Sequence, residues 1–298
     1  MLKPVALCGL LATAATAILI GSPLQAAPSV PGPAAQSFRL GPLRLTALQD
    51  AKFERPNDRK IFGVDAGPAA VASLLKSKGL PDDKIPLNVD ALAVQSGKRV
   101  ILLDTGLGPR AHGALMSSLA TAHIDPKSVT DILITHSHGD HVGGLVDASG
   151  QLAFPNATIR MSELEWKSMQ GNQGQTDLVT AIKGHVKAFV PGKAILPGIT
   201  PIALYGHTPG HVGYEIVSGK ARLLDVGDLV HSSVISLARP EWSVGFDGGH
   251  AQANSTRSAT LKRLSASHEM IFAPHFPFPG VGRIVKSTPG YRWAAGLH

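Results

Sequence analysis

The sequence predicts an α/β or α+β fold in which mixed β-sheets are covered by helices on the outside. Three observations lead to this prediction. Strand-like segments joined by tight turns come early in each half of the chain, and alternating strands and helices follow them. The chain of 298 residues is long enough to bury a substantial core in one large domain. It also contains no repeat of short fixed period that would indicate a solenoid.

The amino-terminal segment is expected to direct export and not to belong to the fold. A lysine near the start precedes the uncharged run Pro4–Ile20, and Ala26 offers a small residue at the expected cleavage point. Residues 1–26 are therefore predicted to be a signal peptide. The apolar run is short for a membrane span, which needs about 20 apolar residues, so no stable membrane insertion is expected after cleavage. We expect a periplasmic or secreted protein with a flexible start at residues 27–36 and one domain at 37–298.

Cysteine usage and charge limit the function classes. The only cysteine, Cys8, lies in the predicted signal peptide, so the mature protein would contain no thiol. This excludes a disulfide framework and any thiolate metal ligand. The formal net charge is +7 and the sequence pI is about 9.6. Because Lys and Arg are spread thinly along the chain, these values favour a basic surface, and no nucleic-acid partner is expected.

The first half of the chain shows alternating apolar residues that are typical of strands, with one helical segment. A turn at Ser96–Lys98 separates two strand-like runs and indicates a hairpin. The expected elements, in order, are strands at Phe38–Leu40 and Leu43–Leu48, a polar loop at Asp50–Lys60 that could cover a site, hairpin strands at Leu87–Val94 and Arg99–Asp104, a helix at Ala111–Ala122 and a strand at Ile132–Ile134.

The second half alternates between strands and helices. The helix predicted at Ser162–Met169 opens on a serine cap, with Glu165 three residues later as in a capping box. The other expected elements are a strand at Thr158–Met161, a helix at Asp177–Ala188, strands at Ile202–Tyr205, Val212–Val217 and Ala221–Val226, a helix at Asn254–Ser267 and a final buried strand at Met270–Ala273.

The segment Thr135–His141 has the composition of a metal site. It places three histidines and one aspartate directly after an apolar strand. Neutral imidazole and carboxylate are ligands that zinc and its first-row neighbours prefer. Residues two apart in an extended segment point the same way, so His136 and His138 could bind one ion together. Asp140 and His141 begin the next turn and could face a second ion.

Four further polar residues follow apolar runs, where a rigid strand can present a side chain at the edge of a sheet. They are Asp104, His207, Asp228 and His275. Each is a weak signal alone, and Asp104 in isolation is more typical of a residue that caps a turn. Together with Thr135–His141 they form an ordered set along the chain.

This ordered set resembles the five motifs of the metallo-β-lactamase superfamily, from about Phe38 onward. The resemblance implies an αββα sandwich of two mixed sheets with a dinuclear metal site along one edge. It implies two Zn²⁺ ions per chain, or other divalent first-row metals. The residues it assigns are His136, His138 and His207 to one ion, Asp140, His141 and His275 to the other, Asp228 as the bridge between them, Asp104 as a residue that orients one ligand, and His211 and His231 behind the ligands or facing the substrate.

The mechanism that the resemblance implies uses a hydroxide held between the two ions. Zinc can lower the pKa of a bound water from about 15.7 to about 7, so this nucleophile needs no protein base. Asp140 and Asp228 are then the expected catalytic residues, with Asp140 able to relay a proton to the leaving group. No Gly-x-Ser-x-Gly motif is present that would indicate a serine nucleophile.

Individual positions indicate which branch of the superfamily the sequence resembles most. His138 stands where the flavin-linked di-iron oxygen reductases carry Glu, and Asp228 supplies a bridging carboxylate that true β-lactamases of the fold lack. The chain ends soon after His275, whereas glyoxalase II continues into a helical region that binds glutathione. The segments around Asp228, Arg239–Asp247 and His275 are similar to methyl parathion hydrolase and its exported relatives.

The leading expectation is therefore an exported dinuclear-zinc hydrolase of the methyl parathion hydrolase type, acting on small phosphotriesters, aryl esters or lactones. The first alternative is an N-acyl homoserine lactonase, although those enzymes usually place Tyr at the position of His231. The second alternative is a non-catalytic basic binding module. Phe276, Phe278, Trp166 and Trp242 are candidates for an apolar pocket, with a core position favoured for each aromatic. A homodimer is possible.

Overall fold

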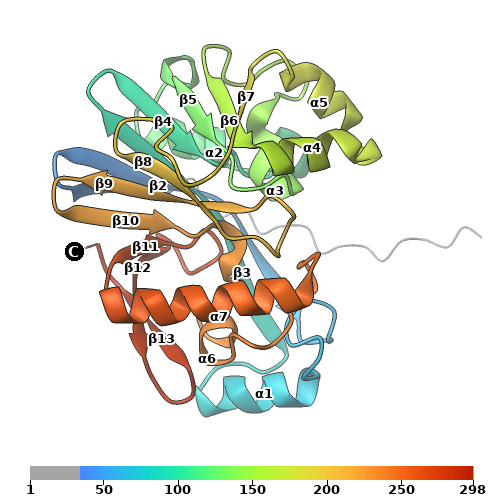
Figure 1. The fold of residues 1–298 in the computed structure, drawn as a ribbon. Coiled ribbons are helices and arrows are strands. Elements are labelled where there is room, and N and C mark those ends of the chain that lie inside the picture. The colour runs from blue at the N-terminus through green and yellow to red at the C-terminus, as the bar shows by residue number, and fades with distance from the viewer. Residues whose placement is uncertain (1–33, 298) are drawn as a thin grey trace, which may run out of the picture.

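Two mixed β-sheets face each other in the computed structural model, which describes residues 34–297 (Figure 1). The predicted signal peptide at residues 1–26 lies outside the described residues, as does most of the segment 27–36. Ala35 and Gln36 already belong to the first strand. Among residues 34–297, none of the helices combines the length and apolar character that a membrane crossing requires.

The first sheet has seven strands that lie in the order of the chain, antiparallel from β1 to β4 and parallel from β4 to β7. Its strands are β1 (Ala35–Leu40), β2 (Leu43–Pro56), β3 (Lys84–Ser96), β4 (Arg99–Leu103), β5 (Asp131–Leu133), β6 (Thr158–Ser162) and β7 (Val186–Phe189).

The second sheet has six strands in the order β13-β12-β11-β10-β9-β8, and only the β10–β11 pair among them is parallel. Its strands are β8 (Ile199–Ala203), β9 (Val212–Ser218), β10 (Ala221–Asp225), β11 (Met270–Phe272), β12 (Val281–Lys286) and β13 (Tyr291–Ala295).

Helices lie on the outer side of each sheet, with α4 and α5 beside the first sheet and α7 along the second (Figure 1). The α-helices are α1 (Pro68–Ser77), α2 (Leu115–Thr121), α3 (Gly139–Val142), α4 (Glu163–Gly171), α5 (Thr176–Ile182), α6 (Ile235–Ala238) and α7 (His250–Ser267). Short 3-10 helices are η1 (Pro109–Ala111), η2 (Pro126–Ser128), η3 (Gly143–Leu145), η4 (Gln173–Gln175) and η5 (Gly227–Leu229).

The core is layered as a four-layer sandwich requires. Between the sheets, Leu92 and Leu103 of the first sheet pack with Tyr214 and Phe272 of the second. A separate cluster joins the outer face of the first sheet to α2, α4 and α5, and another joins the second sheet to α7 through side chains such as Leu261. Apolar residues on both faces of the central strands therefore hold four layers together, which confirms the αββα fold class.

Three predicted elements differ most from the structure. β2 continues through Pro56, so much of the polar segment Asp50–Lys60 is a strand and not a loop. The predicted helix Asp177–Ala188 ends at Ile182 and is followed by β7, which pairs with β6. The strand at Met270 is not the last, because β12 and β13 follow it.

Candidate metal centre

The seven predicted ligands meet where strands of both sheets end. The first sheet contributes the loop after β5 and the short helix α3, and the second contributes the β8–β9 loop, η5 and the turn after β11. In chain order these segments carry His136 and His138, Asp140 and His141, His207, Asp228, and His275. Residues far apart in the sequence are thus brought to one edge of the sandwich.

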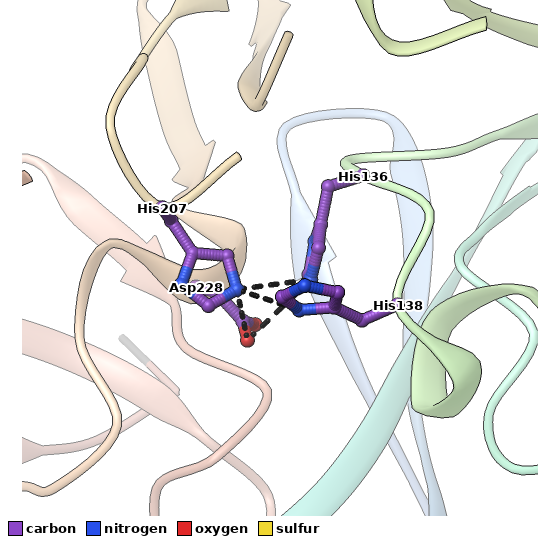
Figure 2. A group of neighbouring side chains, drawn as sticks. All are labelled: His136, His138, His207 and Asp228. Carbon is purple, nitrogen blue, oxygen red and sulfur yellow. Dashed lines mark hydrogen bonds and ion pairs between the residues drawn. The ribbon is translucent and has the colours of Figure 1, made fainter. Parts of the chain in front are cut away.

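The first ligand group consists of His136, His138, His207 and Asp228, whose ligand atoms all lie within 4.8 Å of one another. The Nε2 atom of His207 lies 3.2 Å from Nε2 of His136, 3.0 Å from Nδ1 of His138 and 3.2 Å from Oδ2 of Asp228. Figure 2 shows these three imidazoles and the carboxylate pointing toward one another. Their lone pairs can therefore meet at a single point.

The second ligand group consists of Asp140, His141 and His275, which meet the same criterion. The other oxygen of Asp228, Oδ1, lies 3.1 Å from Nε2 of His141 and 3.0 Å from Nε2 of His275. Because Oδ2 faces the first ligand group and Oδ1 faces the second, Asp228 stands between the two, where a bridging ligand is expected.

The donor atoms fit divalent metal ions. Oδ1 of Asp228 and Nε2 of His141 are buried, and although they lie 3.1 Å apart, neither makes a hydrogen bond to any of residues 34–297. Buried polar atoms without partners are costly, so these two need a partner that the protein does not supply. A donor set of imidazole nitrogens and carboxylate oxygens, without thiolate, is compatible with zinc and with other first-row metals.

Asp104 holds a ligand of the second group in place. The Nδ1 atom of His141 donates a hydrogen bond to Oδ2 of Asp104 at 2.8 Å, and the Thr135 N–H donates to Oδ1 at 2.8 Å. Both residues are buried. This hydrogen bond fixes the ring so that Nε2 faces Asp228, which is the arrangement expected for an imidazole that binds a metal.

Asp247 orients His207 in the same way, a role that was not predicted from the sequence. The Nδ1 atom of His207 donates to Oδ1 of Asp247 at 2.9 Å, and the fully buried guanidinium of Arg257 on α7 donates to Oδ2 at 2.6 Å. Arg257 also donates to the carbonyl of Leu229 in η5. No local sequence pattern predicts this ion pair, because Asp247 and Arg257 meet only when α7 packs on the second sheet.

His275 is oriented by the main chain. Its Nδ1 atom donates to the carbonyl of Asn88 in β3 at 2.6 Å. The backbone adds to this contact, because the N–H of Asn88 donates to the carbonyl of His275 and the N–H of Asp90 donates to that of Pro274. The turn after β11 is therefore attached to the first sheet.

His211 and His231 both contact Asp228. Nδ1 of His211 donates to the Leu204 carbonyl, so its Nε2 accepts the N–H of Asp228 at 3.0 Å. A Cβ on Gly227 would lie 2.6 Å from that Nε2, so glycine makes room for the imidazole and not directly for an ion. His231 places Nε2 3.1 Å from Oδ2 of Asp228 and is fully buried, so it lies behind the bridge and not on the substrate side.

The charge state of the histidines differs across the centre. Burial lowers the pKa of both His136 and His138 below the usual value. Burial also opposes protonation of His141, but the carboxylates of Asp228, Asp140 and Asp104 outweigh it and raise the pKa of His141 well above its usual value. For Asp228, burial raises the pKa, but the surrounding imidazoles prevail and lower it well below its usual value. Asp228 is thus anionic near neutral pH.

A cavity of roughly 660 Å³ opens onto the centre. It reaches His138, Asp140, Asp228 and His275, so members of both ligand groups face it. Most of the side chains in its wall are apolar, namely those of Phe53, Leu87, Leu107, Val146, Leu178, Ala181 and Phe246. The wall also contains the charged residues Arg55, Arg110 and Asp177. Such a cavity suits a small molecule with an apolar part.

The aromatic residues proposed from the sequence do not line this cavity. Phe276 is fully buried in the core between α7 and the second sheet, and Phe278 packs on the cluster between the sheets. Trp166 and Trp242 pack against other core clusters. The core position that was favoured for each of these aromatics is the one they take, whereas Phe53 and Phe246 line the cavity.

Comparison with known proteins agrees with this geometry. Residues 85–275 match the family model of the metallo-β-lactamase superfamily. The solved structure of AidC, a dizinc quorum-quenching lactonase in complex with a product N-hexanoyl-L-homoserine, is 29% identical, with a TM-score of 0.84 over 89% of this chain and 98% of AidC. The hydrolase AbOPH of the β-lactamase superfamily is 29% identical, with a TM-score of 0.79 over 88% and 97% of the two chains.

Among curated proteins, the uncharacterized protein YobT of Bacillus subtilis is 30% identical over 136 residues, which is 42% of this chain. The match spans 56% of the length of YobT, so this chain covers little more than half of that relative. The chain belongs to the metallo-β-lactamase superfamily. Its His and Asp cluster could hold metal ions, and the similar solved structures include a dizinc lactonase and another hydrolase of the superfamily.

Proposed function

We propose that the protein hydrolyses lactones and related carboxylic esters that carry an apolar acyl chain. The observation that supports this most directly is the apolar cavity beside Asp140 and Asp228. The similarity to AidC over nearly its whole length supports the same substrate class, because AidC is a lactonase in complex with an acyl homoserine product. An acyl chain would bury apolar surface against Phe53 and Leu178 while the ester lies at the ligand groups.

The metal centre is expected to hold two divalent ions, with zinc as the first candidate, and these would activate water and polarise the ester carbonyl. The chain itself contributes binding and proton transfer. Asp140 faces the cavity and is 28% exposed. Burial raises the pKa of Asp140, but the neighbouring His141 and His275 lower it below its usual value, so the carboxylate is ionised near neutral pH. It could then accept a proton from the attacking water and pass it to the leaving alkoxide.

Arg55 is suited to bind a second polar group of the substrate. Its guanidinium lies 4.6 Å from the centroid of the Phe53 ring, and both residues line the cavity. The buried Nε atom of Arg55 has no hydrogen-bond partner among residues 34–297. The amide carbonyl of an N-acyl lactone would give this cation an acceptor, with the acyl chain beyond it.

Phosphotriester hydrolysis of the methyl parathion hydrolase type is the second candidate. It is favoured by His231, which stands where acyl homoserine lactonases usually carry Tyr. In either case the proposal includes export through residues 1–26 and a small-molecule substrate.

A substrate panel tests the proposal. Purified protein loaded with Zn²⁺ would be assayed on N-hexanoyl homoserine lactone, a γ-lactone without the amide, phenyl acetate and paraoxon. We expect kcat/KM on the acyl homoserine lactone to exceed that on paraoxon by about ten-fold or more. Equal or higher efficiency on paraoxon would favour the phosphotriesterase, and the absence of lactone hydrolysis would reject the proposal. His138→Ala serves as the control for contaminating esterases.

A further inference from the structure

The buried carboxylate of Glu165 connects two loops of the metal centre. Glu165 lies in the first turn of α4 and has no exposed surface. Its Oε1 accepts hydrogen bonds from the N–H and the hydroxyl of Ser137, at 2.8 and 2.6 Å. Its Oε2 accepts from the hydroxyl of Thr208 at 2.6 Å and from the N–H of Gly210 at 3.1 Å. Each oxygen therefore binds a different loop.

The two loops come from different sheets and carry the imidazoles of the first ligand group. Ser137 stands between the two histidines of the loop after β5, and Thr208 directly follows His207 in the loop after β8. The hydrogen bonds of Glu165 reach neither Asp140 nor the other members of the second ligand group. A change at Glu165 would alter the spacing of one group without removing a ligand.

Ser162 strengthens the same connection. Its hydroxyl accepts the N–H of Glu165 at 3.1 Å and donates to the carbonyl of Gly210 at 2.6 Å. In a complete capping box the glutamate side chain would bind the N–H of the cap residue. Here both carboxylate oxygens bind loop donors. A Cβ on Gly210 would lie 2.2 Å from the Glu165 nitrogen, so only glycine permits this approach.

We propose that Glu165 is a positioning residue that sets the distance between the two loops and thereby the affinity of the ion held by the first ligand group. An acceptor that serves four donors from two loops fixes both loops at once. The proposal rests on the metal centre and not on the substrate class. Metal binding alone can therefore test it, even if the protein hydrolyses no lactone.

Glu165→Gln is the most direct test, because it keeps the size of the side chain and replaces one acceptor oxygen by an NH₂ group that faces a backbone N–H. Glu163→Gln is the matched control, since Glu163 lies in the same turn of α4 and is exposed. Protein stripped with a chelator would be titrated with Co²⁺ and followed by visible absorption, with elemental analysis after dialysis.

For Glu165→Gln we expect one of the two equivalents of Co²⁺ to bind about 10- to 100-fold more weakly, the range known for residues that orient metal ligands. The other equivalent should bind as in the wild type, and the control should match the wild type for both. Unchanged affinity for both equivalents, or an equal loss for both, would overturn the proposal.

Thr208→Val provides a second test if Glu165→Gln does not fold. It removes only one of the four donors and leaves both ligand groups intact. Circular dichroism of the stripped protein would verify its fold. We expect a several-fold weaker binding of the same single equivalent. Wild-type affinity for both equivalents in a folded Thr208→Val protein would also overturn the proposal.

Discussion

The two ligand groups share Asp228, but His207 of the first group and His275 of the second are oriented in different ways. In the first group, His207 is oriented by a side chain, because its Nδ1 donates to Asp247, which Arg257 in turn holds. In the second group, His275 is oriented by a main-chain carbonyl of β3, that of Asn88. A single substitution can remove the Asp247 carboxylate that orients His207, but none removes the main-chain carbonyl that orients His275. Mutation at Asp247 therefore tests the first group, whereas the side-chain support in the second group is that of Asp104 on His141.

The largest effect is expected from Asp228→Asn, which acts on the feature that the two groups have in common. The amide carries no charge and offers one oxygen where the carboxylate faces both groups. We expect retention of both ions to fall and kcat/KM to decrease by about 1,000-fold or more. Elemental analysis and lactone kinetics would measure this, with exposed Asp83→Asn as the control. Loss of one ion alone would contradict the bridging position.

Asp247→Asn should weaken metal binding at the first ligand group and leave binding at the second unchanged. It weakens the hydrogen bond that orients His207 and leaves Arg257 buried without its counter-ion. We expect about 10- to 100-fold weaker binding of one Co²⁺ equivalent. Breaking the buried ion pair should also lower the free energy of unfolding by about 3–5 kcal/mol. Titration and urea denaturation measure the two effects, and an equal loss of both equivalents would show that the supports are not independent.

The ligands could be predicted from the sequence, whereas their supports could not. Each ligand follows an apolar strand in a motif that is readable locally, as His207 follows β8. Asp247 and Arg257 are ten residues apart and acquire a role only through the packing of α7. Glu165 is visible in the sequence as a helix-cap residue, and its contact with the β8–β9 loop depends on how the two sheets meet.

The predictions that differ from the structure, for β2 and for the lining of the cavity, also concern contacts that are not visible in the local sequence. β2 continues through a polar stretch in which half-buried and exposed residues alternate, and Phe53 and Arg55 occupy the half-buried positions. Charged residues in that stretch hide the strand pattern, because its apolar alternation is weak. Phe276 follows a ligand in the sequence, but in the turn after β11 it packs into the core between α7 and the second sheet.

A smaller effect is expected from pH in the metal-free protein. Burial lowers the pKa of His207, but Asp228 and Asp247 outweigh burial and raise it from the usual 6.5 to about 9. A raised folded-state pKa stabilises the fold fully below pH 6.5, and this stabilisation is lost as the pH rises through 9. We expect the free energy of unfolding of chelator-treated protein to fall by the order of 1–3 kcal/mol over this window.

Metal-loaded protein provides the comparison, because His207 must be neutral to bind an ion and so contributes no such loss. Urea denaturation at the two ends of the window measures both forms. The pKa values of His141 and His275 are raised as well, because neighbouring carboxylates outweigh burial, so both add to the loss. A metal-free protein whose stability rises between these pH values would contradict the charged state of these histidines.

The smallest effect is expected from Asn88→Ala, which completes the comparison between the two supports. The substitution removes a side chain that is only 5% exposed but leaves the carbonyl to which His275 donates. The backbone hydrogen bond from Asn88 to the His275 carbonyl also remains. Loss of the buried amide should cost about 1 kcal/mol of stability, whereas both Co²⁺ equivalents should bind within about two-fold of the wild type. A ten-fold weaker equivalent would mean that the Asn88 side chain, and not the main chain of β3, positions His275, and the contrast with Asp247 would then be lost.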